Sequence, residues 1–203
     1  TQAQTPAPAA PTKLPAAPGK LPDSPLAQPA VAAAVPTSPP ASEMVRVPEG
    51  FDVVEYAGDD LAHDIYALTH DTQGRVVVAG AGYVKILVDQ DRDGRAEAAT
   101  LFSDSPKNGA QGLFFHGRSL LAMGDAGLLR YRDQNGDDVA DGPPDVLIKF
   151  KTGGEHDAHA IQQGPDGWWY VIAGNTSEVG AGYASLPTSP VKQPRAGVVL
   201  RFR

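Results

Sequence analysis

The sequence contains no cysteine among its 203 residues, and only two tryptophans and two methionines. The absence of cysteine excludes disulfides, thiolate metal sites and a cysteine nucleophile, and it is neutral about the cellular compartment. No apolar run reaches the ~20 residues that a membrane-spanning helix needs. The chain has 17 basic and 24 acidic residues, a net charge of −7, and the basic residues are scattered singly. This distribution argues against nucleic acid or an anionic membrane surface as a partner.

Large aliphatic and aromatic side chains are scarce in residues 1–43, where alanine, proline, threonine, serine and glutamine prevail. Such a segment cannot bury enough apolar surface to fold, and its prolines favour extended polyproline II backbone. We therefore expect residues 1–43 to be a disordered Pro/Ala-rich linker and residues 44–203 to hold the folded domain. The chain opens at Thr1 without a methionine, as after removal of an export signal or a lipid-anchored residue. We expect an extracytoplasmic protein, periplasmic or at the cell surface, tethered through this linker.

The folded part of the sequence repeats itself. Residues 63–68 (HDIYAL) return 93 positions later as residues 156–161 (HDAHAI), and a glycine and a valine-containing run follow each copy. Residues 89–93 (DQDRD) return 44 positions later as residues 133–137 (DQNGD). A period of about 40 to 50 residues, built from strand-like runs and turns, is typical of propeller blades.

Each unit contains strand-like runs separated by turn chemistry, and none shows a helical period over three turns. In the first unit the runs lie near 66–69, 75–79, 84–88 and 99–102. The second run of each unit is apolar without alternation, as in a strand covered on both faces, whereas the third run alternates. The sequence therefore predicts an all-β fold: a partial β-propeller with about three four-stranded blades of an expected six.

The two ends of the repeat predict an incomplete propeller domain. The third unit stops at Arg203, after its third strand, and closure needs four to eight blades. Residues 51–56 (FDVVEY) precede the first unit and predict an extra outer strand, of the kind that completes the last blade of a closed propeller; that blade is absent from the sequence. An open array of this kind would expose unpaired strand edges and apolar sheet faces.

Two Asp-rich turns are candidate calcium sites. Their candidate ligands alternate along the turns and are Asp89, Asp91, Asp93, Asp133, Asn135 and Asp137. The first turn has Gly94 at the sixth position, but Thr100 stands at the twelfth instead of a bidentate glutamate; in the second turn Asp138 stands where the glycine should be. The alternative is a metal-free Asx turn whose side chains accept hydrogen bonds from backbone amides, and the sequence leaves both open.

His156 is the candidate catalytic residue. It lies just before a predicted central strand, and imidazole is the side chain suited to take up a proton near neutral pH. The same dipeptide recurs at the equivalent position of the repeat, His63, and this recurrence favours a packing role instead, such as a hydrogen bond to the backbone of a neighbouring blade. The long insert of residues 175–195, rich in Gly, Ser and Pro, is of the kind that often covers a site.

Several of these segments together resemble a known family. They are residues 47–51 (VPEGF), residues 71–78 (DTQGRVVV), the Asp-rich turn, His156 and residues 164–167 (GPDG). The combination resembles the soluble quinoprotein sugar dehydrogenase and sorbosone-dehydrogenase-like propellers. It is most similar to the planctomycete-type "membrane-bound dehydrogenase" branch, in which the propeller often precedes cytochrome c modules.

The resemblance implies a function for the chain. In quinoprotein sugar dehydrogenases, a histidine at the position of His156 removes the substrate hydroxyl proton while hydride passes to pyrroloquinoline quinone (PQQ), held with calcium. By this resemblance we expect an exported quinone-dependent oxidoreductase that acts on sugars or alcohols, with a cytochrome c module as a partner in the parent protein. The alternative is a non-catalytic propeller that binds a carbohydrate or a protein.

Overall fold

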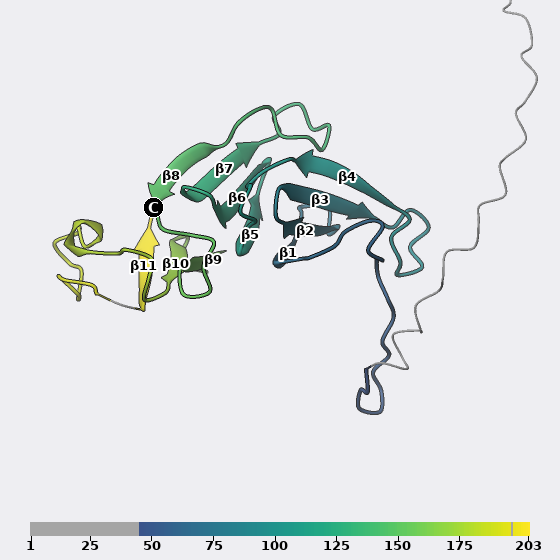
Figure 1. Cartoon of the computed structure of the whole chain (residues 1–203), viewed down its shortest axis with the longest axis horizontal. Helices are drawn as coiled ribbons and strands as arrows, with labels where there is room; N and C mark the ends of the chain where they lie inside the picture. Colours follow the sequence, from purple (N-terminus) through teal and green to yellow (C-terminus); the bar gives the residue numbers. More distant parts are fainter. Residues whose placement is uncertain (1–44, 196) are drawn as a thin grey trace, which may run out of the picture. The chain divides into compact units, whose positions relative to one another are not determined.

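The computed structural model describes residues 45–195 and 197–203, which belong to one compact unit. The predicted linker over residues 1–43 lies outside the described residues. Within the described part, eleven strands form three antiparallel sheets, and one turn of 3-10 helix lies at Ala181–Tyr183 (Figure 1). None of the helical structure in residues 45–195 and 197–203 is long and apolar enough to cross a membrane.

Each sheet is a meander in which strands adjacent in sequence pair side by side. The first sheet has the order β1 (Ala67–His70), β2 (Val76–Gly80), β3 (Tyr83–Val88) and β4 (Ala98–Ser103). The second has the order β5 (Gly112–His116), β6 (Ser119–Gly124), β7 (Gly127–Arg132) and β8 (Asp145–Lys149). The third has the order β9 (Ala158–Gln163), β10 (Trp169–Ala173) and β11 (Val198–Phe202). The predicted all-β partial propeller and its strand positions are confirmed.

The sheets pack through their faces, with the first strand of each sheet next to the first strand of the following one. Strand β1 contacts β5, and β5 contacts β9. One apolar cluster joins the first and second sheets; its largest members are Phe102, Tyr131, Ile86, Leu120 and Leu129. A second cluster joins the second and third sheets, with Met123, Leu128, Ile161, Val171 and Phe150. Each fully buried aliphatic or aromatic side chain contributes roughly 1.5–3 kcal/mol, so these two clusters hold the sheets together.

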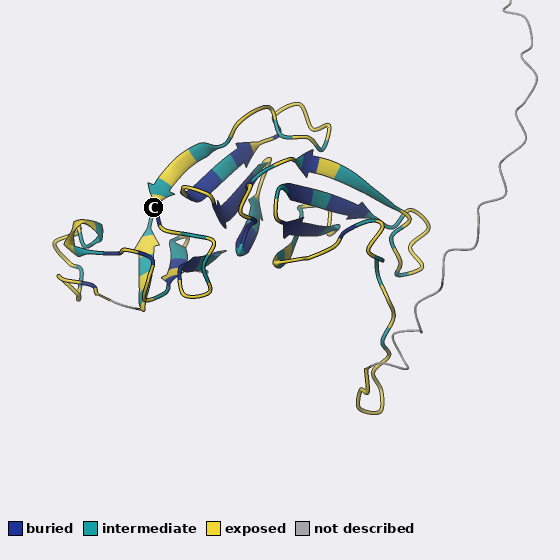
Figure 2. Ribbon diagram, in the orientation of Figure 1, coloured by how far each residue is buried: buried dark blue, intermediate teal, exposed yellow. Residues whose placement is uncertain are grey.

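The second strands of the first two sheets are buried almost along their whole length, as the unalternating apolar runs predicted (Figure 2). Strand β10 differs, because Ile172 is 54% exposed while Val171 and Ala173 are fully buried. On the neighbouring strand, Val199 is 67% exposed. The third sheet therefore buries one face against the second sheet and leaves an apolar row on its other face, which no further sheet of the described chain covers.

Residues 51–56, predicted as an outer strand that would complete a last blade, form no strand in the part of the chain that the structure describes. Phe51 and Val54 are 69% and 66% exposed. The end of the segment is attached to the first sheet, because the Tyr56 carbonyl accepts a hydrogen bond from the Ala96 amide at 2.7 Å. A strand needs a partner to satisfy its backbone groups, and this segment has none among the described residues.

Candidate functional site

The topology sorts the loops into two ends. The loops that precede β1, β5 and β9 lie at the same end of the sheets as the β2–β3, β6–β7 and β10–β11 links, because each meander starts there. We call this the entry end. The β1–β2 and β3–β4 turns and their equivalents lie at the opposite end, which we call the turn end.

His156 lies at the entry end, in the turn just before β9, and its side chain is exposed. The residue that builds this turn is the next one, Asp157, which is only 2% exposed. Its carboxylate accepts hydrogen bonds from the Gly154 amide (2.9 Å) and the Thr176 hydroxyl (2.6 Å), and Lys151 lies 3.4 Å away. These contacts fix the backbone on which the imidazole of His156 sits.

The hydrogen bond from Thr176, together with the Gly154 amide and Lys151, lowers the pKa of the Asp157 carboxyl below its usual value, although burial works against this. These hydrogen-bond donors and the nearby Lys151 thus favour the ionised form of the buried carboxylate. The Thr176 amide also donates to the His156 carbonyl (3.0 Å), and the Gly174 amide donates to the Asp157 carbonyl (2.9 Å). A side chain at Gly174 would collide with the His156 carbonyl at 2.1 Å, so only glycine permits this approach.

The echo of this site in the first sheet is built differently. His63 lies 3.3 Å from the carboxylate of Asp64, but Asp64 is exposed, with a side chain 84% accessible. The carbonyl of His63 accepts a hydrogen bond from the Tyr83 hydroxyl, which takes the place that the Thr176 amide has at His156. Neither imidazole bonds the backbone of a neighbouring sheet in the described residues, so the form of packing role suggested by the repeat is not seen there.

A polar network at the entry end was missed by the sequence analysis. The Asn108 side-chain oxygen accepts from the Asp125 amide at 2.6 Å, while the Asp125 carboxylate accepts from the Asn108 amide at 2.9 Å. Thr152 contacts both residues. Its hydroxyl donates to the Asp125 carbonyl and accepts a hydrogen bond from the side-chain amide nitrogen of Asn108 at 3.2 Å. The network ties the loop before β5 to the β6–β7 turn and to the loop that carries His156. The only sequence signals were turn residues, which do not reveal partners 17 to 44 positions apart.

The first Asp-rich turn lies at the turn end, between β3 and β4. Its members Asp89, Asp91 and Asp93 come together with Glu97, each offering a carboxylate oxygen within 4.8 Å of the others. Glu97 was missed, although its place at the ninth position of the turn was a usable signal. The same carboxylates accept backbone hydrogen bonds, for example from the Gly94 amide to Asp89 (3.1 Å). The turn thus has the hydrogen bonds of an Asx turn and the oxygen cluster of a hard-cation site.

The second Asp-rich turn, between β7 and β8, repeats this backbone. The Asp133 carboxylate accepts from the amides of Gly136 (2.7 Å), Asp137 (3.2 Å) and Asp138 (3.2 Å). The Asn135 amide group donates to Asp137 at 3.0 Å. An amide donor here uses up carboxylate capacity that a cation would need, so this turn fits a cation less well than the first.

Both turns place two residues in the left-handed region. The fourth and sixth positions are Arg92 (φ 63°) and Gly94 (φ 91°) in the first turn, and Gly136 (φ 77°) and Asp138 (φ 67°) in the second. The missing glycine at position 138 therefore does not change the turn. Instead, this position supplies a carboxylate that Arg75 of the first sheet binds through both terminal nitrogens, at 2.7 and 2.6 Å.

Arg75 links the first and second sheets at the turn end. Its Nε donates to Asp71 at 2.6 Å, so one guanidinium spans carboxylates of both sheets. The hydrogen bond from Arg75 lowers the pKa of Asp138, and the same contact raises the pKa of Arg75 above its usual value. This ion pair joins residues 63 positions apart, so no local sequence pattern predicts it.

The structure does not bring the two predicted sites together. His156 lies at the entry end, whereas all six predicted calcium ligands lie in the turns of the turn end. A cation in the Asp-rich turns would therefore be remote from His156.

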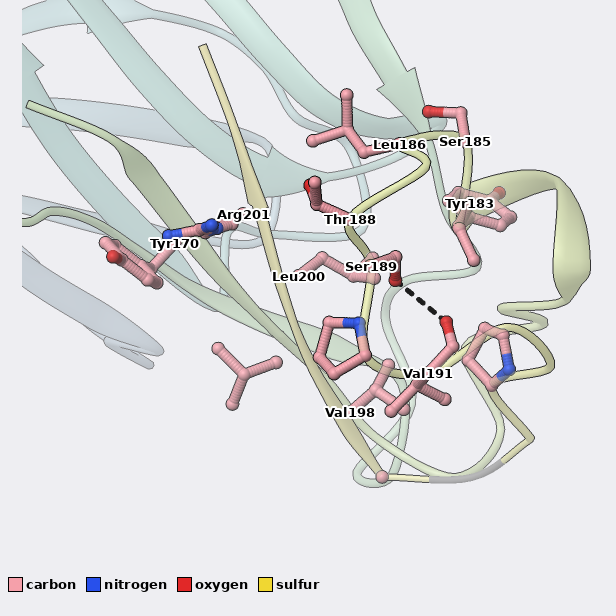
Figure 3. A pocket seen from close by; sticks show the side chains of 15 residues that line it. Tyr170, Tyr183, Ser185, Leu186, Thr188, Ser189, Val191, Val198, Leu200 and Arg201 are labelled. Carbon is pink, nitrogen blue, oxygen red and sulfur yellow. Dashed lines mark hydrogen bonds between the residues drawn. The ribbon is translucent and has the colours of Figure 1, made fainter.

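The insert between β10 and β11 borders a cavity of about 420 Å³ on the free side of β11. Figure 3 shows Leu186, Thr188 and Ser189 of the insert facing this strand, with Tyr170 and Arg201 on its other side. The Ser189 hydroxyl donates to the Val191 carbonyl at 2.8 Å and stiffens the insert locally. The cavity is thus bounded by a strand edge that pairs with no other strand of the described residues.

Three antiparallel sheets packed through their faces define the class of the protein: it is a partial β-propeller. Within this class, the chain belongs to the family described as Domain of unknown function (DUF7133), whose model matches residues 38–193. None of the curated proteins compared with the chain matches it. Among solved structures, it is similar to a candidate oxidoreductase (glucose dehydrogenase) of Thermus thermophilus, at 22% identity and a TM-score of 0.41. That match covers 68% of this chain and 43% of the other chain.

Proposed function

We propose that the entry end is the reaction site of an exported, quinone-dependent oxidoreductase that acts on sugar or alcohol hydroxyl groups, with His156 as the general base. The supporting observation is a difference between the two equivalent His-Asp turns of the repeat. The turn of His156 is fixed by a buried, multiply bonded Asp157, whereas the echo turn has an exposed aspartate. A general base has to be positioned before the reaction, and at His156 a buried aspartate holds the backbone of the turn, whereas the aspartate beside His63 is exposed.

The assigned role is the proton transfer. In alcohol oxidation the base removes the hydroxyl proton while the carbon gives up hydride, so that a carbonyl forms. The exposed imidazole of His156 can accept that proton, and the donors on Asp157 keep the turn in place. A bound quinone would supply the two-electron acceptor.

Two lysines at the entry end, Lys151 and Lys107, do not offer a free cation to the tricarboxylate PQQ. Lys151 is engaged with Asp157, and Lys107 lies 3.2 Å from Asp104 and donates to its carbonyl. Both amino groups are thus committed to partners of opposite charge or to backbone. We therefore assign no quinone contact to these residues and derive no step through the quinone. The cytochrome c partner and the extracytoplasmic location belong to the same proposal.

A dye-linked assay tests the proposed activity. The purified chain is supplied with quinone and calcium and offered a panel of aldoses and primary and secondary alcohols. We expect substrate-dependent reduction of the dye that saturates with quinone. Absence of both turnover and saturable quinone binding in a folded sample would contradict the proposal.

The second candidate function is a non-catalytic propeller that binds carbohydrate or protein, and the carboxylate cluster of Asp89, Asp91, Asp93 and Glu97 favours it. This cluster lies at the turn end, where a cation can order loops without taking part in chemistry. Calcium-dependent retention on a glycan array without any turnover would favour this second function. Retention that ignores calcium and accompanies turnover would favour the first.

A further inference from the structure

The chain contains two Asn-Gly pairs, Asn108-Gly109 and Asn135-Gly136. Asparagine is a chemically labile residue, and it is most easily attacked by its own backbone when glycine follows, because glycine has no side chain to shield the attacking amide nitrogen. The attack closes a succinimide ring and removes the side-chain amide. Both pairs have the same local sequence chemistry, so their surroundings decide which of them reacts.

Asn108 is held in the polar network of the entry end, where it joins the loop before β5 to two other loops. Its side-chain oxygen accepts from the Asp125 amide at 2.6 Å, and its side-chain nitrogen donates to the Thr152 hydroxyl at 3.2 Å. The Gly109 amide, which would be the attacking group, donates to the Pro106 carbonyl at 3.1 Å. A backbone carbonyl does not take up a proton, and the side chain cannot turn toward the amide without breaking contacts between loops.

Asn135 is exposed in the second Asp-rich turn, and its two side-chain hydrogen bonds both go to Asp137. The Asp137 amide donates to the side-chain oxygen of Asn135 at 3.0 Å, which stabilises the negative charge that develops there when the side-chain carbon is attacked. The side-chain nitrogen, which leaves in the reaction, donates to the Asp137 carboxylate at 3.0 Å. Both bonds lie within the turn, so Asn135 can react without breaking a contact between loops.

The attacking group at this pair is the amide nitrogen of Gly136, and Asp133 is placed to accept its proton. The Asp133 carboxylate lies 2.7 Å from this nitrogen, within the reach of a general base. Arg118 lies beside the same peptide group, because a side chain at Gly136 would meet its guanidinium at 2.8 Å. Arg118 is held there by its hydrogen bond to the Gln134 carbonyl at 2.7 Å. A cation at this distance favours the negatively charged form of the amide nitrogen.

The second Asp-rich turn also borders a cavity of about 180 Å³ between the first and second sheets. Gly136, Asp133 and Arg118 line one side of it, and Asp71 and Arg75 of the first sheet line the other. The cavity is polar on both sides and large enough for more than one water molecule. Water, the second reactant in the loss of a side-chain amide, therefore has room beside Gly136.

We propose that Asn135 is a site of self-catalysed deamidation in the folded protein, assisted by Asp133 and Arg118. The Gly136 nitrogen gives its proton to Asp133 and bonds to the side-chain carbon of Asn135. The bond from that carbon to the side-chain nitrogen then breaks, and the nitrogen takes the proton and leaves as ammonia. Water adds to either carbonyl of the succinimide and opens the ring, which leaves aspartate or isoaspartate. Water is the only other reactant, and no electrons are transferred.

Both products change the junction of the first and second sheets. Asp138, which Arg75 binds through both terminal nitrogens, lies three residues after Asn135 in the same turn. Isoaspartate lengthens the backbone before Asp138 by a methylene group, and aspartate replaces the donor to Asp137 with a second negative charge. Either change weakens the hydrogen bonds of the turn, so we expect modified chains to unfold at a lower temperature than unmodified ones.

Peptide mapping by mass spectrometry tests the proposal by following each asparagine with time. In the folded chain at neutral pH, Asn135 should gain the mass of an amide-to-acid change, with isoaspartate among the products, while Asn108 stays intact. In concentrated urea both pairs lose their surroundings, so the two asparagines should convert at similar rates. The unfolded chain thus serves as the control for the effect of sequence alone.

Arg118→Ala separates assistance from exposure, because it removes the cation and leaves the Asn135-Gly136 pair unchanged. The substitution should slow the conversion of Asn135 several-fold in the folded chain and leave the rate in urea unchanged. Arg92→Ala removes an exposed arginine from the first Asp-rich turn and is the matched control, which should change neither rate. An intact Asn135 in the folded chain, Asn108 converting as fast as Asn135 before unfolding, or an unchanged rate in Arg118→Ala would each overturn the proposal.

Discussion

At the scale of single residues, the structure assigns different roles to identical dipeptides. His63-Asp64 and His156-Asp157 occupy the same place in the repeat, but only Asp157 is buried and bonded. The cause lies in the following link. In the third sheet the insert supplies Thr176, whereas in the first sheet a two-residue link brings the Tyr83 hydroxyl to the His63 carbonyl. Both histidines could be located in the sequence. Which of the two turns is fixed by a buried aspartate could not be predicted, because Thr176, which bonds Asp157, lies 19 positions away from it.

Asp157→Asn tests this support through the pH dependence of stability. The pKa of Asp157 is lowered in the folded protein, so its contribution is fully present above the ordinary value of about 3.9 and is lost as pH falls through the lowered value. The variant should lose roughly 1–3 kcal/mol of unfolding free energy near neutral pH, and the loss should shrink below about pH 4. Chemical denaturation at several pH values measures this. Asp64→Asn, the matched control, should show no such pattern.

Arg75 is the residue on which the junction of the first two sheets depends at the turn end. Arg75→Ala leaves Asp71, whose side chain is 4% exposed, without its cation, so we expect a loss of roughly 2 kcal/mol in unfolding free energy. Arg75→Lys should recover little, because an ammonium cannot bind Asp138 through two parallel hydrogen bonds. Arg95→Ala removes one exposed ion pair and should cost less than about 0.5 kcal/mol. Equal losses for Arg75→Ala and Arg95→Ala would contradict this assignment.

Among the secondary-structure elements, the positions of turns and strands depend on local sequence and were predictable. The long-range contacts between them were not. The Asp-rich turns were predictable from spacing alone, yet Glu97 was missed because the calcium-loop pattern has its closing carboxylate at the twelfth position, where Thr100 stands. The Arg75–Asp138 pair was invisible because no local pattern connects two turns 63 positions apart. Residues 51–56 form no strand because a strand depends on a partner as well as on its own sequence, and the described residues do not supply that partner.

Backbone conformation in the Asp-rich turns predicts two opposite substitutions. Arg92 is exposed at φ 63°, where the second turn has Gly136, so Arg92→Gly should raise the unfolding free energy by roughly 0.5–1 kcal/mol. Gly94→Ala should lower it by roughly 1 kcal/mol, because φ is 91° there and the space around it is open, leaving strain as the only effect. Thermal unfolding of both variants gives the comparison. The same sign for both would show that the conformation of the turn does not decide their stability.

Calcium binding at the first turn is expected to be weak. The four carboxylates supply a hard-oxygen set but no bidentate glutamate at the twelfth position, so we expect a Kd of roughly 10⁻⁴ to 10⁻³ M. Calorimetry should detect this heat, and Glu97→Gln should weaken it, whereas Asp141→Asn in the second turn should not. No heat at millimolar calcium would leave the metal-free Asx turn, and sub-micromolar affinity would show that further ligands complete the shell.

At the scale of the whole molecule, the repeat was the strongest signal in the sequence. Periods of 44 and 93 residues predicted the number of sheets, their strand order and the face-to-face packing, because each propeller unit needs a neighbour to bury its faces. The arrangement of the two ends could not be predicted in the same way. Only the structure shows that His156 and the Asp-rich turns lie at opposite ends, which separates the proposed base from the proposed calcium site.

The proposed function depends on His156, and not on the equivalent His63, as the general base at the entry end. The decisive measurement compares the turnover of His156→Ala with that of His63→Ala in the dye-linked assay. With folding intact, His156→Ala should lower turnover by at least ~100-fold, the usual contribution of a positioned general base, and His63→Ala should leave it nearly unchanged. Equal effects of the two substitutions, or loss of stability without a specific loss of turnover, would contradict the account.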